Sequence, residues 1–323
     1  LCYINKTTGA ILPLCNDPLC KHKGFEEVCA ASSAGNETYN TLSYNESDGK
    51  LYFARRDVMY GGEDVTIIYS LDIDSMDTTL HEHYRTPEGD RIGYLVACDG
   101  DVYFSQDYYN EEAEEYGIII YKLNTSNDNV EKVLSFANDD VRYFVKNGVL
   151  YYDIKSVLHA YDINAGTDTE IINRGEISYF ILLDDQILCQ STSGIYLYSY
   201  DGTLTDTLYT SEVTGDRMSF TIDDSNNIYF SGYSPEEYER SWPHTGSATN
   251  PTGGKIFKLS EGNTELFYSF PTNTIIDSIQ AFNSSSGTVL YVEASVEGYN
   301  FNYFLYEEDG NIVCYTVPYV DIP

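Results

Sequence analysis

The feature that most constrains the fold of this chain is an internal repeat with a period of about 40 to 50 residues. A short apolar strand preceded by a turn occurs six times, at residues 49–53, 100–104, 148–152, 185–189, 227–230 and 287–291. Another strand follows each copy, at residues 68–72, 120–124, 158–162, 197–201, 256–260 and 304–307. Aromatic and aliphatic residues alternate in both, and Gly, Asn or Asp lie between them, which is typical of antiparallel β-hairpins.

Each repeat has room for one more strand before this pair and one after it. Residues 142–146, for example, precede one pair, and residues 169–172 follow it. Four-stranded antiparallel units repeated radially form a β-propeller, an all-β fold that leaves only short, protected strand edges. The sequence therefore predicts six complete blades, over residues 38–86, 91–136, 140–174, 176–211, 216–270 and 274–318.

A further strand pair at the N-terminus bears on the number of blades. Residues 1–5 and 10–14 resemble the last two strands of a blade. Because a closed ring favours a complete neighbour for every blade, we expect seven blades, with six as the alternative in which this hairpin is added to one of them. In either case we expect one propeller domain over residues 1–323, with a partial blade at 1–15, a Cys/His loop at 15–37 and the complete blades at 38–318.

The net charge excludes two classes of partner. The chain has 51 Asp and Glu residues against 18 Lys and Arg residues, which gives a formal net charge of −33. This charge repels phosphate backbones and anionic headgroups, so we expect no binding to nucleic acid or to a membrane surface. The longest apolar runs, such as 117–121 and 179–183, are far shorter than the roughly 20 residues that cross a bilayer, so we expect no transmembrane segment.

The composition also suggests a compartment. The chain is rich in Tyr, Asn, Ser, Thr and Gly as well as acidic, which is typical of extracytoplasmic bacterial proteins, so we expect a location at the cell surface. It begins with Leu1 rather than Met, so we expect that an upstream piece has been processed off or trimmed, and a signal peptide or lipid-anchor segment could have been part of it. We expect the propeller itself to be a monomer.

The connections between strands differ on the two faces of the predicted propeller. On one face the second strand of each unit leads into the third, and four of these connections are long, at residues 54–65, 105–117, 231–255 and 293–300. On the other face the turns are short, as at residues 201–202. We name these the insertion-bearing face and the turn face. Because long insertions in compact domains are commonly functional, we expect ligand binding at the insertion-bearing face.

Two insertions carry the candidate ligand-binding residues. The longest contains Tyr238, Arg240, Trp242 and His244. Together these side chains offer an aromatic plane, a cation and an imidazole to a sugar ring or a peptide, although Trp242 could equally serve only to anchor the loop. The insertion at 105–117 contains Tyr108 and Tyr109 beside five carboxylates, which either attract Ca²⁺ or a basic partner or are simply solvated.

A cluster of cysteines and a histidine lies near the N-terminus, at Cys15, Cys20, His22 and Cys29. Three thiolates and an imidazole within so short a segment can hold a structural Zn²⁺ in a tetrahedral site. In an oxidising compartment the same cysteines would instead form disulfides, with a Cys2–Cys15 bridge and a Cys20–Cys29 bridge as one pairing. Both alternatives predict that this segment is stabilised covalently or by a metal.

The residues around this cluster carry a resemblance. Residues 3–9, followed by 14–22 and Cys29, resemble the opening of uncharacterised TolB-like β-propeller surface lipoproteins of Gram-positive gut anaerobes, which contain a domain of unknown function. The resemblance implies an exported, lipid-anchored propeller, and Cys15, Cys20, His22 and Cys29 match its pattern. Cys2 departs from it, because an aromatic residue is expected there. The resemblance implies no particular activity.

Sequence motifs of the common enzyme classes are missing. The chain has no Gly-x-Ser-x-Gly elbow, no phosphate-binding Gly-Lys-Ser/Thr loop, no His-Glu-x-x-His helix and no dinucleotide fingerprint. His81 and His83 flank Glu82 on a predicted strand and therefore share a face, which is typical of a surface pair; metal binding there would need a third ligand. We predict no catalytic residues.

These observations predict a non-enzymatic extracytoplasmic propeller that binds a glycan or a protein partner on its insertion-bearing face. One alternative is a polysaccharide lyase or hydrolase acting from the same face, with a His or Tyr beside two carboxylates or an Arg in a deep pocket. Another is a structural spacer in the cell envelope.

Overall fold

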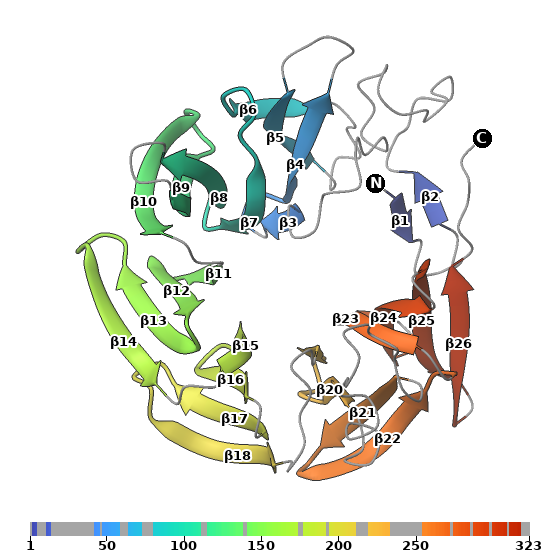
Figure 1. Ribbon diagram of the computed structural model, residues 1–323. Coiled ribbons are helices and arrows are strands. Elements are labelled where there is room, and N and C mark those ends of the chain that lie inside the picture. Colours follow the sequence, from blue (N-terminus) through green and yellow to red (C-terminus); the bar gives the residue numbers. More distant parts are fainter. Residues whose placement is uncertain are drawn as a thin grey trace. The chain divides into compact units, whose positions relative to one another are not determined.

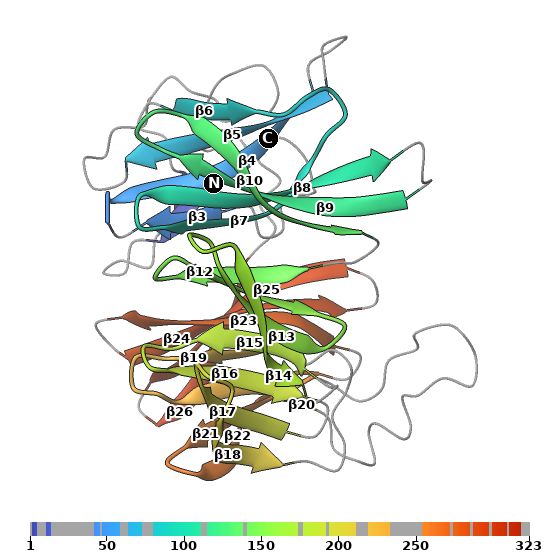
Figure 2. The same ribbon diagram turned by 90° about the vertical axis from the view of Figure 1, so that its left-hand side faces the viewer.

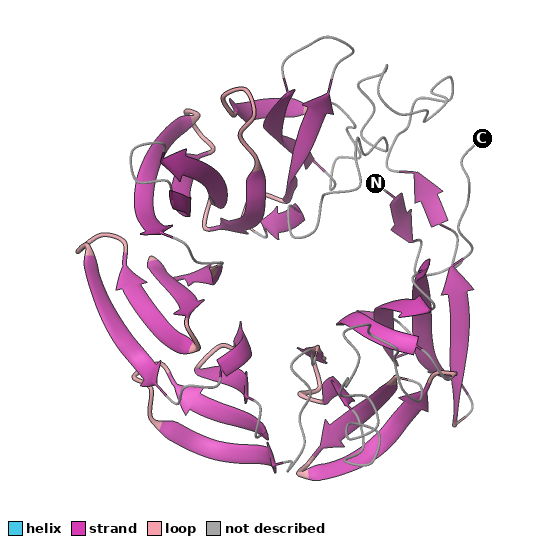
Figure 3. Cartoon of the chain, in the orientation of Figure 1, coloured by secondary structure: helices cyan, strands magenta, loops and turns pink. Residues whose placement is uncertain are grey.

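The computed structural model describes sixteen segments of the chain, which are residues 2–4, 11–13, 42–45, 47–58, 64–72, 80–110, 115–137, 141–173, 177–191, 194–210, 219–232, 254–271, 274–284, 287–296, 299–308 and 310–317. The chain separates into two compact units, residues 1–170 with 322–323, and residues 171–321. Within the described segments every regular element is a β-strand (Figure 3).

Unit 1 contains three four-stranded antiparallel sheets, each with its strands in chain order (Figure 1). The first consists of β3 (Leu42–Asn45), β4 (Lys50–Val58), β5 (Asp64–Asp72) and β6 (His81–Arg85). The second consists of β7 (Ile92–Cys98), β8 (Asp101–Asn110), β9 (Glu115–Asn124) and β10 (Asn129–Ala137). The third consists of β11 (Arg142–Lys146), β12 (Val149–Ile154), β13 (Val157–Asp162) and β14 (Thr167–Asn173), and the end of β14 is counted in unit 2.

Unit 2 repeats the same arrangement three times. Its first sheet consists of β15 (Ile177–Leu182), β16 (Gln186–Ser191), β17 (Gly194–Ser199) and β18 (Leu204–Thr210). The second consists of β19 (Phe220–Ile222), β20 (Ile228–Gly232), β21 (Lys255–Ser260) and β22 (Asn263–Ser269). The third consists of β23 (Thr274–Ser284), β24 (Gly287–Val296), β25 (Tyr299–Glu308) and β26 (Asn311–Val317).

The described residues thus contain six four-stranded sheets, one inside each predicted unit, so the six-blade alternative is confirmed and the seventh blade that we favoured is not found. The N-terminal strands β1 (Cys2–Ile4) and β2 (Ile11–Pro13) pair only with each other in the part of the chain that the structure describes. The last sheet, β23–β26, is complete without them, because all four of its strands come from residues 274–317.

The cores lie between neighbouring sheets and follow from the two-residue period of the strands. In β8, Phe104 packs toward the first sheet, with Tyr52 and Ile68, whereas its neighbour Tyr103 packs toward the third sheet. In β20 of unit 2 the same pair of residue types recurs, because Phe230 joins the cluster with Leu188 and Tyr229 joins the cluster with Leu290. Consecutive aromatic residues therefore serve the two opposite faces of one sheet.

Three of the four predicted long insertions are mostly strand. The prediction of a loop at residues 105–117 is wrong, because β8 continues to Asn110 and pairs with β9 from Glu115 onward (Figure 2). The same holds at 54–65, where β4 reaches Val58 and β5 begins at Asp64, and at 293–300, where β24 reaches Val296 and β25 begins at Tyr299. Charged and aromatic residues can extend a hairpin beyond the packed core, since the strand ladder satisfies their backbone groups. Most of the fourth insertion, 231–255, lies outside the described residues.

Candidate functional site

The structure describes two of the six predicted ligand-binding residues. Tyr238, Arg240, Trp242 and His244 lie outside the described residues, whereas Tyr108 and Tyr109 lie on β8 near the insertion-bearing face of unit 1. Tyr108 is half-buried opposite Gly117 of β9, and a Cβ atom at Gly117 would lie only 2.5 Å from the Tyr108 ring. This tyrosine covers a glycine across the ladder, which is a packing role.

Tyr109 instead forms an exposed aromatic pair with Tyr116. The two residues are directly opposite in the β8–β9 ladder, and their ring centroids are 4.6 Å apart with a tilt of 41°. Their exposed fractions are 49% and 69%, so both rings are accessible to a partner. At the insertion-bearing face of unit 2, Tyr299 and Phe301 of β25 are exposed as well. Aromatic side chains at such positions offer flat apolar surface to a sugar ring or to a protein.

The predicted metal or disulfide site at Cys15, Cys20, His22 and Cys29 lies outside the described residues, as does any pairing of these cysteines. The structure describes three other cysteines, Cys98, Cys189 and Cys314, and none of these three forms a disulfide. The pKa of the Cys98 thiol is raised to about 11, chiefly by burial and also by the carboxylates of Asp99 and Asp101. This thiol is therefore protonated and unreactive at neutral pH.

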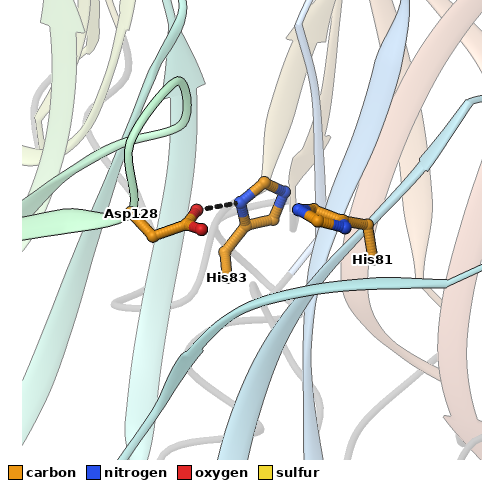
Figure 4. A group of neighbouring side chains, drawn as sticks. All are labelled: His81, His83 and Asp128. Carbon is orange, nitrogen blue, oxygen red and sulfur yellow. Dashed lines mark hydrogen bonds and ion pairs between the residues drawn. The ribbon is translucent and has the colours of Figure 1, made fainter.

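A cluster of chemically active side chains lies on the turn face of unit 1. His81 and His83 of β6 are in edge-to-face contact, with ring centroids 4.6 Å apart, and Asp128 in the β9–β10 turn reaches them from the second sheet (Figure 4). Nδ1 of His83 lies 2.7 Å from Oδ1 of Asp128, and Nε2 of His83 lies 2.8 Å from the hydroxyl oxygen of Ser70. The imidazole of His83 is thus held at both nitrogens.

A β-bulge in β6 explains how His83 comes to face the second sheet. The β5–β6 register shifts between Ile68 and Tyr69, which leaves His83 as the extra residue between Glu82 and Tyr84. Bulges re-aim a side chain in this way, and they are common near functional sites. As a result His83 and Tyr84, although consecutive, both contact residues of the second sheet.

The turn that carries Asp128 is also well ordered by hydrogen bonds. The backbone amide of Asp128 donates to the carbonyl of Asn124, the side-chain oxygen of Asn124 accepts bonds from Ser126, and the hydroxyl of Thr125 donates to the carbonyl of Gly100. Asp128 has a positive φ of 58°, which Asp tolerates better than most residues. The carboxylate is therefore held in place before any ligand binds.

The electrostatics of His83 favour its neutral form. Burial lowers the pKa of His83 and outweighs the opposing effect of Asp128, while the nearby His81 and Lys50 also lower it. His83 is 7% exposed, whereas His81 is exposed to solvent. With the proton on Nδ1 directed at Asp128, Nε2 carries the lone pair and accepts the bond from Ser70.

The order Ser70–His83–Asp128 matches the hydrogen bonding of a serine-hydrolase triad, but its surroundings do not fit that chemistry. Ser70 is 2% exposed and lies within the β5 ladder, so its hydroxyl cannot attack a substrate. His159 forms a similar structural arrangement in the third sheet, where it stacks on Tyr152 and both contact Asp168. The Ser70–His83–Asp128 cluster is therefore not a serine-hydrolase triad.

The sequence identified His81 and His83 as a pair that would need a third ligand to bind a metal, but it did not identify Asp128. The aspartate lies 45 residues from His83 in the chain. No local motif marks it, because its proximity depends on the packing of the second sheet against the first. The only signal in the sequence was that Asp128 lies in the turn between the third and fourth strands of its blade. This turn is on the turn face, where the fourth strand of the preceding blade begins.

Unit 2 has a cavity of about 810 Å³ on its turn face, between the sheets β15–β18 and β19–β22. Its rim contains five carboxylates, from Asp184, Asp185, Asp223, Asp224 and Glu261, and its wall contains leucine and isoleucine side chains. Its size is in the range of small-molecule sites. This cavity was not predicted, because the turn face was expected to carry only plain turns.

Asp223 is the most constrained of these carboxylates. It is buried and accepts hydrogen bonds from the backbone of Ser225, the backbone and side chain of Asn227, and the hydroxyls of Tyr229 and Thr288. Burial acts to raise its pKa, but the bonds from Asn227, Thr288 and Ser225 lower it by more, so the net pKa is lowered. The side chain is therefore a charged structural centre at the rim of the cavity.

Across the described residues, no helix is long and apolar enough to cross a membrane.

Comparison with known proteins shows the fold. No protein-family model matches the sequence, and no curated protein matches it.

Solved β-propellers do match the structure. The extracellular domain of a protein described as a hybrid two-component system, BT4673 of B. thetaiotaomicron, has a TM-score of 0.56 and 16% identity over 90% of this chain and 34% of its own. The acylaminoacyl peptidase of Pyrococcus horikoshii has a TM-score of 0.54 and 9% identity over 86% of this chain and 44% of its own. The N-terminal domain of Nup159 has a TM-score of 0.51 and 12% identity over 85% and 75%.

The chain is therefore an all-β protein of the β-propeller class. It spans about a third of the length of the first of these neighbours. One neighbour is a peptidase and another is an extracellular domain, so the likeness assigns the fold and not a reaction. The resemblance to TolB-like lipoproteins stays a prediction.

Proposed function

We propose that this chain is an extracytoplasmic, non-enzymatic binding propeller that holds a glycan or a protein partner on its insertion-bearing face. The observation that carries the proposal is the exposed Tyr109–Tyr116 pair at the end of the β8–β9 hairpin. The two rings lie beyond the packed core, on a part of the β8–β9 ladder in which the backbone groups are paired across the strands. The aromatic surface is therefore preorganised for binding.

The chemistry around the pair narrows the partner. Glu111, Glu112, Glu114 and Glu115 lie between the two tyrosines in the sequence, and the whole chain carries a net charge of −33. Aromatic rings beside carboxylates suit a partner that combines a flat apolar surface with hydroxyl or cationic donors. A neutral glycan or a basic protein surface meets both requirements, whereas an acidic polymer would be repelled.

An extracytoplasmic location is part of the proposal. It is supported by the acidic, tyrosine-rich composition, by the resemblance of residues 3–29 to exported lipoproteins, and by the extracellular domain among the structural neighbours. Antibody labelling of intact cells would test it directly. Signal from intact cells is expected, and signal only after lysis would contradict it.

A glycan array combined with a pull-down from surface extracts tests the binding itself. Wild-type protein should retain a ligand that the double variant Tyr109→Ala/Tyr116→Ala loses. Tyr315 of β26 is 51% exposed in unit 2 and provides a matched control, since Tyr315→Ala removes an exposed tyrosine outside the insertion-bearing face. Equal capture by all three proteins would show that the tyrosine pair does not bind the partner.

A further inference from the structure

The cluster on the turn face of unit 1 has the composition of a metal site. One ligand atom each from His81, His83 and Asp128 lie within 4.8 Å of one another. Two imidazoles with a carboxylate suit borderline divalent ions such as Zn²⁺, Ni²⁺ and Cu²⁺, whereas Mg²⁺ and Ca²⁺ prefer oxygen ligands. The two imidazoles thus favour this class of ion.

The geometry assigns different roles to the three residues. In Figure 4, Asp128 and His81 lie on opposite sides of the His83 ring, and a ring nitrogen of His81 faces the His83 nitrogen that is not bonded to Asp128. Metal-binding histidines commonly donate their other N–H to a carboxylate, which fixes the tautomer and the orientation of the ring. The 2.7 Å contact between Nδ1 of His83 and Asp128 has this form.

We propose that His81 and Nε2 of His83 bind a divalent transition-metal ion of the Zn²⁺ class, with Asp128 as the residue that positions His83. The ion takes the place of the Ser70 hydroxyl as the partner of Nε2, and water completes its coordination. His81 is exposed, so its torsions can adjust to bring its nitrogen to a bonding distance of about 2.1 Å. The exposed side of His81 and the half-exposed carboxylate of Asp128 give the ion access from solvent.

This site is independent of the proposed binding function, since it lies on the turn face and shares no residue with the tyrosine pair. Its two sides come from different sheets, β6 of the first and the β9–β10 turn of the second. An ion bound to the two histidines of β6 would therefore depend on the second sheet only through the contact between Asp128 and His83, and it should stabilise unit 1 by mass action.

Calorimetric titration of the full chain with Zn²⁺ tests the proposal. The protein is first stripped with a chelator, its accessible cysteines are blocked with N-ethylmaleimide, and millimolar Mg²⁺ occupies oxygen-only sites. Cys98 stays protonated and does not compete as a thiolate. Wild-type protein should bind one Zn²⁺, and His81→Ala should weaken binding at least about tenfold. Asp128→Asn, which keeps an oxygen acceptor and tolerates the positive φ, should weaken it by roughly tenfold to a hundredfold.

Two matched variants control for the loss of a histidine or of a charge elsewhere. His159→Ala removes a histidine that stacks on Tyr152, and Glu82→Gln removes the carboxylate between the two histidines that is paired with Arg85. Both should bind Zn²⁺ like the wild type. Spectra of bound Cu²⁺ should show coupling to two imidazole nitrogens in the wild type and to one in His81→Ala.

Different outcomes would overturn the metal site and the positioning role of Asp128. Absence of Zn²⁺ binding by the wild type, or equal affinity in wild type and His81→Ala, would overturn the site. Undiminished affinity in Asp128→Asn would overturn the positioning role of the carboxylate. Far-ultraviolet circular dichroism of each variant shows that it is folded, which is expected because His81 lies at the surface.

Discussion

The carboxylate of Asp128 lies 2.7 Å from Nδ1 of His83, although 45 residues of chain separate the two. The contact joins the first and second sheets of unit 1, and a third atom, the hydroxyl of Ser70, holds the other nitrogen of the same ring. A bulge in β6 and a hydrogen-bonded turn after β9 both contribute to this geometry. The bulge and the turn thus together position the polar contact between the first and second sheets.

His83 should remain neutral at pH values where a free histidine begins to protonate. Burial lowers its pKa from the ordinary 6.5, so the unfolded state takes up a proton at higher pH than the folded state does. The stability that depends on neutral His83 is therefore complete above about pH 6.5 and is lost as the pH falls below it toward the lowered pKa. Nitrogen-15 NMR of the imidazoles should show His83 protonated on Nδ1 alone at pH 6.5, whereas a titration midpoint at or above 6.5 would contradict the buried environment.

Replacement of Asp223 by alanine should destabilise unit 2. The substitution removes the acceptor of one buried and several part-buried hydrogen bonds, so we expect a loss of roughly 3 kcal/mol in the free energy of unfolding, measured with denaturant. Asp224→Ala changes an exposed neighbour and should have little effect.

The effect of Asp223 should also depend on pH. Because the folded-state pKa of Asp223 is lowered, its contribution is complete above about pH 4 and is lost as the pH falls below that value. The difference in stability between wild type and Asp223→Ala should therefore shrink in acid. A difference that grows as the pH falls would show that the carboxylate is not held in its charged form.

Gly117→Ala should destabilise the β8–β9 hairpin. A methyl group at this position would lie 2.4 Å from the carbonyl oxygen of Phe136 and 2.5 Å from the ring of Tyr108, so both must move. Such overpacking costs about 1–3 kcal/mol in the free energy of unfolding. Gly93→Ala in the neighbouring strand meets only the Ser105 hydroxyl, at 3.3 Å, and serves as the control. Equal stability of the two variants would contradict the close approach at Gly117.

Cys98 should resist alkylation in the folded protein. With a pKa of about 11 its thiolate fraction at pH 8 is small, so iodoacetamide should react roughly a hundredfold more slowly than with an ordinary cysteine. Peptide mass spectrometry measures the rate, and the same cysteine in denatured protein provides the reference. Similar rates in both states would contradict the raised pKa of the half-buried Cys98 thiol.

The repeat in the sequence was sufficient to predict the fold, and local pattern was not sufficient to predict the sites. Alternation such as Tyr103–Phe104 and Tyr229–Phe230 places consecutive residues on opposite faces of a strand, so the strands and their grouping can be read from the chain. The number of blades could not be read as well, because the hairpin of β1 and β2 has the same local pattern as half a blade.

The sites depend on contacts between sheets, which the sequence does not display. Tyr109 was predicted as part of a loop, but its partner Tyr116 emerged only once the ladder of β8 and β9 was extended past the core. His81 and His83 were identified from their spacing, whereas Asp128 required the packing of one sheet on the next. The cavity of unit 2 is formed by turns of two sheets, and neither turn alone indicates it.

An affinity measurement shows whether the pair of Tyr109 and Tyr116 binds the partner. The ligand captured in the glycan or protein screen is titrated into wild type, Tyr109→Ala/Tyr116→Ala and Tyr315→Ala. Loss of two central aromatic contacts of this kind is expected to cost at least about 2 kcal/mol of binding free energy, or roughly thirtyfold in affinity. We expect this loss in the double variant and wild-type affinity in Tyr315→Ala, whereas equal affinities in all three proteins would show that the tyrosine pair does not bind the partner.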